Sequence, residues 1–280
     1  MYLIADAGAT KINWALLNKD QVIEFSTSGY NPNVADSNYL RQLLISGFPT
    51  DFNPNEVSSV LYFGAGCGSV YGKERVQQAL KTYFIMSLEI KVLTDLEGAA
   101  LAVFNKSEGI IGILGTGANA GFYNGNTIID SPISLGYLLG DEGSGAYLGK
   151  LLIPKIIRNE FDTETVNRFY AFYSLTPAEL IKNIYSAPQP NKYLGSFVPF
   201  IKENSNNPEM EQLVKIAFQN YYNLFMEPIV NKHINQPVAM IGGVAFAFKN
   251  QLTKVFEANN ISNFTLTDSP LKLLVEKLNS

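Results

Sequence analysis

The chain contains one cysteine and one histidine among its 280 residues. Cys67 alone cannot form an internal disulfide, which is typical of a protein from a reducing compartment. With His233 as the only histidine, the chain has few residues from which to form a Ser–His–Asp triad or a zinc site of histidine and cysteine. The sequence therefore argues against these two kinds of catalytic centre.

Charged residues are also few, at 16% of the chain, and 21 Lys+Arg stand against 25 Asp+Glu. The resulting net charge of -4 gives no broad positive field for nucleic acid or anionic lipid. The first residues lack the basic start and long apolar core of a signal peptide. Residues 109–129 carry no charge, but polar and turn-forming residues interrupt them, so no membrane segment is predicted. We expect a cytoplasmic protein that binds neither nucleic acid nor membranes.

Hydrophobic residues make up 46% of the chain, and their periodicity shows one pattern used twice. The first copy begins with three short apolar runs, typical of an antiparallel meander, with a Gly-rich break after the first run. Alternating helices and strands follow, which gives the order β-β-β-α-β-α-β-α. The expected strands cover residues 2–5, 13–17, 21–26, 58–63 and 88–94, and the expected helices lie near 40–44, 73–84 and 96–104.

The second copy starts at Gly109 and again has a Gly-rich first turn, at 115–117. A helical stretch then intervenes before a strand at 238–241, a helix at 249–258, a strand at 264–266 and a last helix from 271. This pattern predicts an α/β fold of two mixed sheets that pack as two lobes with a cleft between them. The predicted lobes are 1–107 and 108–280, with a helical insertion at about 143–235.

Glycine lies in the first hairpin turn of each copy, at Gly8 and Gly117. Glycine permits positive φ and a close approach of backbone N–H groups to an anion, so two such turns could bind a polyphosphate. Beside Gly8, Thr10 and Lys11 offer a hydroxyl and a cation, and Asp6 offers a carboxylate for hydrated Mg²⁺. The alternative is that both are ordinary hairpin turns.

Two other nucleotide motifs are nearly present. Residues 115–120 match G-x-G-x-x-A, the dinucleotide fingerprint of NAD-dependent dehydrogenases. That fingerprint must open a helix, whereas the residues after Ala120 continue as a hairpin, so the dehydrogenase remains a distant alternative. Residues 143–150 end in Gly-Lys like a P-loop, but the spacing is one residue too long and Leu151 replaces the Mg²⁺-binding Ser or Thr.

Three carboxylates stand at the starts of expected helices. Asp95 ends a strand, which places it at the carboxyl edge of the sheet, where α/β folds bind their ligands. There it could be a general base or simply the N-cap of the next helix. Asp141 and Glu142 precede another helix, and their alternative role is to stabilise its N-terminus. Cys67 is interpreted as a small packed residue.

Four motifs follow one another along the chain: Asp6-Ala-Gly-Ala-Thr-Lys11 with Trp14, Thr94-Asp-Leu-Glu-Gly98, Gly115-Thr-Gly-Ala-Asn119 and Gly140-Asp-Glu-Gly-Ser-Gly145. In this order they resemble the N-acetylglucosamine kinases of the BadF/BadG/BcrA/BcrD ATPase family, within the actin/hexokinase/heat-shock-70 ATPase superfamily. The resemblance runs from about Met1 to Ala247. It implies a duplicated ribonuclease H-like, actin-like ATPase fold with two lobes around a nucleotide cleft.

The resemblance implies ATP and Mg²⁺ as cofactors and an amino sugar as substrate, with N-acetylglucosamine converted to its 6-phosphate. Asp95 matches the base that takes the proton from the attacking sugar hydroxyl. Asp6 would bind the metal, and a homodimer is expected from family analogy. Gly242 and Gly243 would lie near adenosine, and Asn31, Asp95 and Asp141 would bind the sugar. The phosphate-binding residues would be Gly8, Ala9, Thr10, Lys11, Gly115, Thr116 and Gly117.

The chain departs from the family pattern in three places. Ala118 replaces a frequent Ser, residues 134–137 replace a run richer in Gly and Trp, and the last helix begins without the usual Gly. The first two affect sugar preference and the third the packing on the nucleotide side. Related ATPases that share an iron–sulfur cluster need two cysteines per subunit, which Cys67 alone cannot supply. Sugar-responsive repressors need a helix-turn-helix before the first strand, whereas the expected meander begins at Tyr2. An ATP-binding module without kinase activity remains the alternative.

Overall fold

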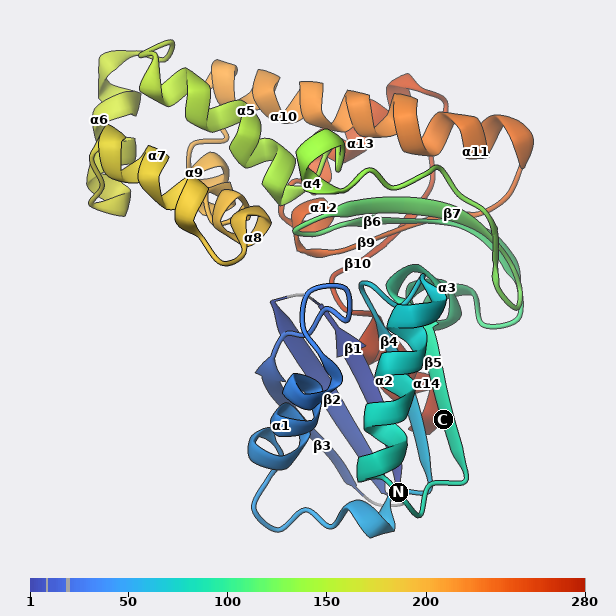
Figure 1. Ribbon diagram of the computed structural model, residues 1–280. Coiled ribbons are helices and arrows are strands. Elements are labelled where there is room, and N and C mark those ends of the chain that lie inside the picture. The colour runs from blue at the N-terminus through green and yellow to red at the C-terminus, as the bar shows by residue number, and fades with distance from the viewer. Residues whose placement is uncertain (9, 19–20, 280) are drawn as a thin grey trace. The chain divides into compact units, whose positions relative to one another are not determined.

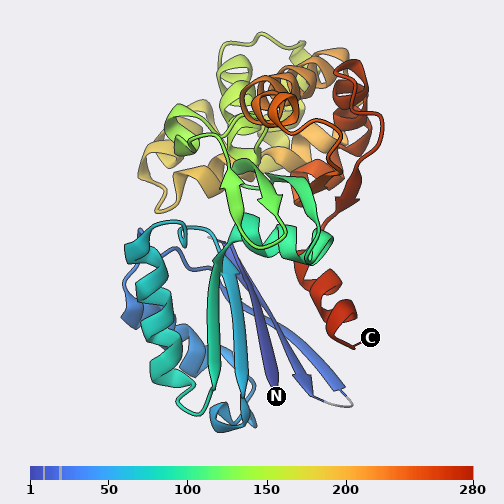
Figure 2. The ribbon, with the colours of Figure 1, turned by 90° about the vertical axis from the view of Figure 1, so that its right-hand side faces the viewer.

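The computed structural model describes residues 1–8, 10–18 and 21–279. The chain divides into two compact units (Figures 1 and 2). Unit 1 comprises 1–107, 123–128 and 269–280, and unit 2 comprises 108–122 and 129–268. None of the helices in the described residues is long and apolar enough to cross a bilayer.

Unit 1 contains a mixed sheet of five strands in the order β3-β2-β1-β4-β5. Strands β1 and β2 pair antiparallel, as do β2 and β3, so the expected meander is present. Strands β4 and β5 continue the sheet parallel to β1, and their connections carry helices, because parallel neighbours need a long crossover connection. The strands are β1 (Tyr2–Ala7), β2 (Lys11–Asn18), β3 (Gln21–Ser28), β4 (Ser59–Gly64) and β5 (Glu89–Thr94).

Helices cover both faces of this sheet because its strands alternate apolar side chains between the two faces. Leu3 and Tyr62 point to the face covered by α1 (Ser37–Gly47) and α2 (Val70–Tyr83). Ile4 and Phe63 point to the opposite face, which is covered by α3 (Asp95–Phe104) and α14 (Pro270–Asn279). A short 3₁₀ helix, Pro54–Glu56, precedes β4.

The last helix, α14, packs on unit 1, where Figure 2 shows it in red beside the first sheet. Leu271, Leu274 and Val275 are buried there, and Lys277 Nζ donates to the Val103 carbonyl at 3.1 Å. The second lobe predicted from the sequence, 108–280, includes this helix, whereas the structure packs the helix with unit 1. The apolar stripe of α14 fills the face of the first sheet that α3 leaves uncovered.

Unit 2 repeats the arrangement, with the order β10-β9-β6-β7-β8 in its own five-stranded sheet. Strand β9 is parallel to both β6 and β10, as β4 is to β1 and β5. The expected duplicated α/β fold of two mixed sheets is therefore confirmed. The strands are β6 (Glu108–Leu114), β7 (Ala118–Asn124), β8 (Ile128–Asp130), β9 (Val238–Ile241) and β10 (Thr265–Thr267).

Residues 115–120 do not open a helix. A three-residue turn joins β6 to β7, which is too short for a parallel crossover, so the two strands form a hairpin. The dinucleotide fingerprint lacks the helix N-terminus that would hold a pyrophosphate, and the dehydrogenase alternative is wrong for this reason.

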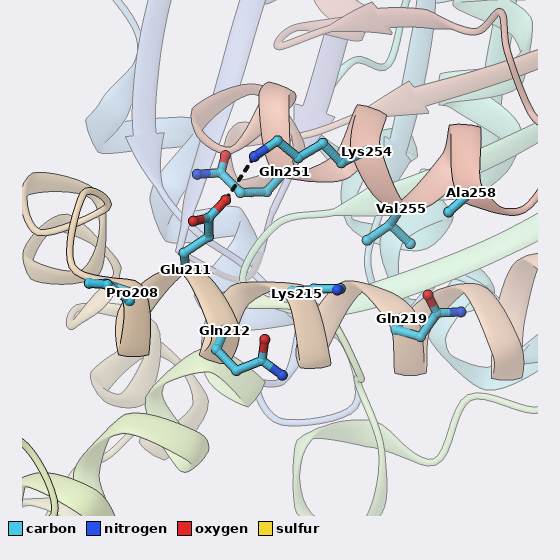
Figure 3. Close-up of a pocket in the computed structure, with 9 residues that line it drawn as sticks. All are labelled: Pro208, Glu211, Gln212, Lys215, Gln219, Gln251, Lys254, Val255 and Ala258. Carbon is cyan, nitrogen blue, oxygen red and sulfur yellow. Dashed lines mark hydrogen bonds and ion pairs between the residues drawn. The ribbon is translucent and has the colours of Figure 1, made fainter.

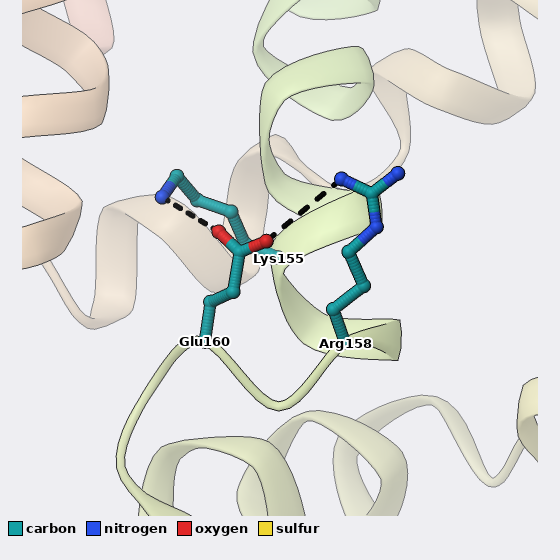
Figure 4. Close-up of polar contacts among 3 residues, drawn as sticks. All are labelled: Lys155, Arg158 and Glu160. Atoms are coloured by element: carbon teal, nitrogen blue, oxygen red, sulfur yellow. Dashed lines mark hydrogen bonds and ion pairs between the residues drawn. The ribbon is translucent and has the colours of Figure 1, made fainter.

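Most of the remaining residues of unit 2 are helical and pack into one hydrophobic core with its sheet (Figure 1). Helix α5 ends in a surface cluster in which Glu160 pairs with Lys155 at 3.1 Å and with Arg158 at 3.8 Å (Figure 4). The helices are α4 (Gly136–Leu139), α5 (Gly145–Ile157), α6 (Thr163–Tyr173), α7 (Pro177–Ser186), α8 (Pro190–Gly195), α9 (Val198–Glu203), α10 (Pro208–Tyr221), a π-helical turn (Tyr222–Met226), α11 (Glu227–Lys232), α12 (Gly243–Ala247) and α13 (Lys249–Ala258).

Candidate active site

Two carboxylates lie at the carboxyl edge of the first sheet. Asp6 is the fifth residue of β1, and Asp95 directly follows β5. Because β1, β4 and β5 are parallel, these strands end at the same edge of the sheet. Strand β4 lies between the two, with Phe63 paired to Asp6 on one side and to Leu93 on the other. The fold therefore brings the predicted metal carboxylate and the predicted base together in unit 1.

The environment of Asp6 disfavours its ionised form. Burial, and next the negative charge of Asp95, raise the pKa of Asp6 from 3.8 to about 7. Two carboxylates in a poorly solvated place repel each other unless a cation or a proton compensates their charge. This arrangement suits a carboxylate that acts with a divalent cation.

The described residues contain no group of three or more His, Cys, Asp or Glu side chains that could hold a metal ion. This is compatible with Mg²⁺, which proteins often bind through one or two carboxylates together with substrate phosphates and water. Asp6, as an oxygen donor, fits that kind of site.

Asp95 is not the N-cap of α3. The N-cap is Thr94, whose hydroxyl accepts from the Glu97 N–H at 3.0 Å, while the Glu97 carboxylate accepts from the Thr94 N–H at 3.0 Å. The alternative role of Asp95 as a cap is therefore wrong, because the preceding threonine fills it. The Asp95 carboxylate accepts from the Leu96 N–H at 2.9 Å. Burial chiefly raises the pKa of Asp95, against the lowering effect of such backbone hydrogen bonds.

The turn between β1 and β2 is closed by a hydrogen bond from the Gly8 N–H to the Lys11 carbonyl at 2.9 Å. Because this N–H is used within the turn, a phosphate would have to be bound by other donors. Thr10 and Lys11 are exposed on the turn, and the predicted phosphate ligand Ala9 lies outside the described residues.

Asn31 lies next to this turn, since the Tyr30 N–H donates to the Gly8 carbonyl at 3.3 Å. The Asn31 side-chain oxygen accepts from the Asn33 N–H at 2.9 Å, which leaves the amide NH₂ as the part of this side chain suited to a sugar hydroxyl. Arg75 fixes the same loop by donating to the carbonyls of Pro32 and Ala35 at 2.9 and 3.3 Å.

In unit 2, the turn at 115–117 is fixed by hydrogen bonds to its carbonyl groups. The N–H groups of Gly145 and Ala146, at the start of α5, donate to the carbonyls of Gly115 and Thr116 at 2.8 and 3.1 Å. The Gly115 N–H donates to the Gly117 carbonyl at 3.0 Å. Among the backbone hydrogen bonds of the described residues, neither the Thr116 N–H nor the Gly117 N–H donates to a carbonyl of this turn or of α5. These two donors suit an anion such as a phosphate.

Asp141 lies beside this turn. A side chain on Gly117 would begin 3.2 Å from the Asp141 carboxylate, and Asp141 itself is buried with φ of 58°. The N-cap of α5 is Ser144, whose hydroxyl accepts from the Tyr147 N–H at 3.1 Å, so neither Asp141 nor Glu142 is the cap. The structure thus places Asp141 in unit 2 next to the second glycine turn.

Gly242 joins the same edge of the second sheet. Its φ of 116° favours glycine, and a side chain there would collide with the Leu114 carbonyl at the end of β6. Beyond the two chain neighbours of Gly243 and the backbone of its own helix, none of the described residues has an atom within 4 Å of the position that a Gly243 side chain would occupy. The residues predicted near adenosine therefore lie beside the predicted phosphate turn.

Cys67 and His233 stand apart from this chemistry. Cys67 is buried, and burial and the Asp95 charge raise the pKa of its thiol to about 12, which keeps it protonated and unreactive. His233 stacks on Phe122 with ring centroids 3.7 Å apart, and its Nε2 lies 3.0 Å from the Asp130 carboxylate. Both are structural residues.

A pocket of about 360 Å³ lies in the groove between α10 and α13 (Figure 3). Lys254 and Glu211 form an ion pair across it at 2.8 Å, and no predicted site residue lines it.

Glu97 is not among the site residues predicted from the sequence, although the motif Thr94-x-x-Glu97 is a recognisable capping box.

The two units together define an actin-like ATPase fold, with the same strand order in both sheets and a glycine turn after the first strand of each. A structure described as a "Putative N-acetylglucosamine Kinase" from Porphyromonas gingivalis is 32% identical, with a TM-score of 0.93, and the match covers 100% of this chain and 99% of the other. The chain therefore belongs to the N-acetylglucosamine kinase-like family that this protein represents.

Other solved structures share the fold at lower identity. A protein of the same description from Chromobacterium violaceum is 17% identical, with a TM-score of 0.76 and coverage of 98% and 97%. A glucokinase from Streptomyces griseus, in complex with glucose and AMPPNP, is 14% identical, with a TM-score of 0.58 and coverage of 96% and 94%. No protein-family model and no curated protein matches the chain.

Proposed function

We propose that the protein transfers the γ-phosphoryl group of ATP to a hydroxyl of an amino sugar, with N-acetylglucosamine converted to its 6-phosphate. The observation that carries this proposal is the pair of carboxylates, Asp6 and Asp95, at one sheet edge. Neither caps a helix, and each has a raised pKa. Family membership supports the choice of a sugar kinase.

Asp95 is the proposed general base. Its carboxylate would accept the proton of the attacking hydroxyl, for which a base must lie within about 2.6–3.2 Å of that oxygen. The raised pKa of Asp95 brings it closer to neutral pH, which favours proton transfer in the transition state. Asn31, on the loop beside the first turn, would donate to a sugar hydroxyl, and Asp141 would accept from another.

Asp6 is the proposed metal carboxylate. When Mg²⁺ is bound with ATP, it would neutralise phosphate charge as the phosphoryl group moves. In unit 2, the N–H groups of Thr116 and Gly117 would donate to phosphate oxygens, and Gly242 and Gly243 would lie against adenosine. Phosphoryl transfer depends mainly on positioning and charge stabilisation, which these groups supply.

A coupled assay of ADP formation tests this proposal against the alternative, an ATP-binding module without kinase activity. ADP release that requires both Mg²⁺ and an amino sugar supports the kinase. ADP formation that does not depend on any of the sugars tested, or no ADP formation at all, contradicts the kinase proposal. The panel should include glucosamine and N-acetylmuramic acid beside N-acetylglucosamine, because these sugars differ only in groups that a few side chains recognise.

A further inference from the structure

Glu97 makes more hydrogen bonds than a helix cap needs. One oxygen of its carboxylate accepts from the Thr94 N–H at 3.0 Å and from the Thr94 hydroxyl at 3.1 Å. The other oxygen accepts from the Thr127 hydroxyl at 2.7 Å. Thr127 lies 30 residues further along the chain, in the turn between β7 and β8. Glu97 therefore joins the first turn of α3, which carries Asp95, to a distant hairpin.

The chain offers an internal comparison. Thr176 and Glu179 form the same capping box at the start of α7, with hydrogen bonds of 2.8, 2.7 and 3.3 Å. Glu179 is exposed, whereas Glu97 is partly buried. The bond from Thr127 is thus an addition to the ordinary box, and it belongs to the helix that carries the proposed base.

The tip of the β7–β8 hairpin, residues 123–128, contacts α3 at a second point. The Tyr123 hydroxyl donates to the Asn105 carbonyl at 3.0 Å, just after the end of α3. Residues 123–128 accordingly belong to unit 1, although β7 and β8 pair in the second sheet. The tip therefore contacts α3 near both of its ends.

We propose that Glu97 is a positioning residue for Asp95, which fixes the first turn of α3 against the β7–β8 turn so that the Asp95 carboxylate is held ready for the acceptor hydroxyl. This inference rests on the proposed kinase function. Hydrogen bonds to a charged carboxylate are roughly twice as strong as neutral ones, so three of them hold this turn firmly.

The charge of Glu97 also acts on Asp95. The negative charge of Glu97 raises the pKa of Asp95, and hydrogen bonds from Thr127 and Thr94 keep the pKa of Glu97 itself low. Further charged or titratable groups around them are Asp6 on β1, Cys67 after β4, Lys73 on α2 and Tyr123 on β7. Of these, Lys73 is the cation, and it stabilises the ionised form of Glu97.

Two variants of the full-length protein separate the roles of Glu97. Glu97→Gln keeps an oxygen that can accept from Thr94, as Gln does in natural capping boxes, but it removes the charge. Thr127→Val keeps the shape of the side chain and the charge of Glu97, but it removes the bond to the hairpin. Glu179→Gln is the matched control for the loss of charge from a capping box. The measurements are kcat, the KM values for ATP and sugar, and the pH profile of kcat/KM.

For Glu97→Gln, we expect the acid limb of the profile to move to lower pH, because a like charge on the same turn is lost. For Thr127→Val, we expect kcat to fall several-fold, up to about 10²-fold, with both KM values within about twofold. Glu179→Gln should leave the rate and the pH profile unchanged.

A Glu97→Gln profile that superimposes on that of the parent overturns the inference, and so does a Thr127→Val variant with parental kcat. An equal shift in Glu179→Gln also overturns it, since the effect would then be general. A parent protein without sugar-dependent ADP formation refutes the kinase function and this inference together. An active parent with unaffected variants refutes only the role of Glu97.

Discussion

Asp6 should destabilise the free protein at neutral and alkaline pH. The folded state raises the pKa of this carboxyl from 3.8 to about 7, so the folded protein holds a proton that the unfolded chain has already lost. Stability from this group is therefore fully present below pH about 4, falls as the pH rises towards 7, and reaches its minimum above that value. Asp6→Asn removes the titration and should be more stable than the parent only in the upper range.

The size of the effect follows from the same values. At 1.36 kcal/mol per pKa unit, a rise from 3.8 to about 7 corresponds to about 4 kcal/mol. Asp6 retains some contact with solvent, and relaxation around a buried charge lowers its cost, so we expect about 1–2 kcal/mol. Mg²⁺ with ATP should recover part of this stability in the parent, because a cation supplies the missing charge, and less in Asp6→Asn.

Thermal unfolding of both proteins between pH 4 and 9, with and without Mg²⁺ and ATP, measures these differences. We expect melting temperatures that coincide near pH 4 and separate above pH 7, with Asp6→Asn the more stable. Parallel profiles over the whole range would refute the raised pKa of Asp6. An equal response of both proteins to Mg²⁺ and ATP would refute its metal role.

Three further substitutions test separate parts of the account. Asp95→Asn should lower kcat by about 10²–10⁴-fold with a melting temperature at or above that of the parent, and near-parental kcat would remove Asp95 as the base. Gly242→Ala should cost about 1–3 kcal/mol, because φ of 116° is strained for alanine, and an unchanged calorimetric transition would contradict the close packing on β6. Leu274→Ala, at a buried position of α14, should cost about 2–5 kcal/mol, read by the fluorescence of Trp14 in the core of unit 1. A parental transition there would show that α14 does not stabilise unit 1.

The order of strands and helices could be predicted because each signal is local. Alternating apolar residues with turn residues between them indicated the two meanders, and the repeat of a strand followed by glycine indicated the duplication. The hairpin at 115–120 could be distinguished from a dinucleotide-binding turn because Asn124-Gly-Asn126 is a second turn signal shortly after it.

Other features depend on contacts that no local pattern specifies. The stripe of Leu271, Leu274 and Val275 indicates an amphipathic helix but not which sheet it covers, so the lobe boundary placed α14 with its neighbours in the chain. By contrast, the cap of α3 has a local signal, because Glu97 three residues after Thr94 completes a capping box and so favours Thr94 over Asp95 as the cap. The bond from Thr127 to Glu97 joins residues 30 positions apart, which the sequence alone does not predict.

Mass spectrometry of the reaction product tests the central claim most directly. The parent protein and Asp95→Asn are incubated with Mg²⁺, ATP and N-acetylglucosamine, and the sugar is analysed for its mass and for the position of any new phosphate. The account predicts a singly phosphorylated sugar modified at the 6-hydroxyl with the parent, and almost none with Asp95→Asn. A parent that leaves N-acetylglucosamine and every other amino sugar of the panel unmodified, while it still hydrolyses ATP, would contradict the claim.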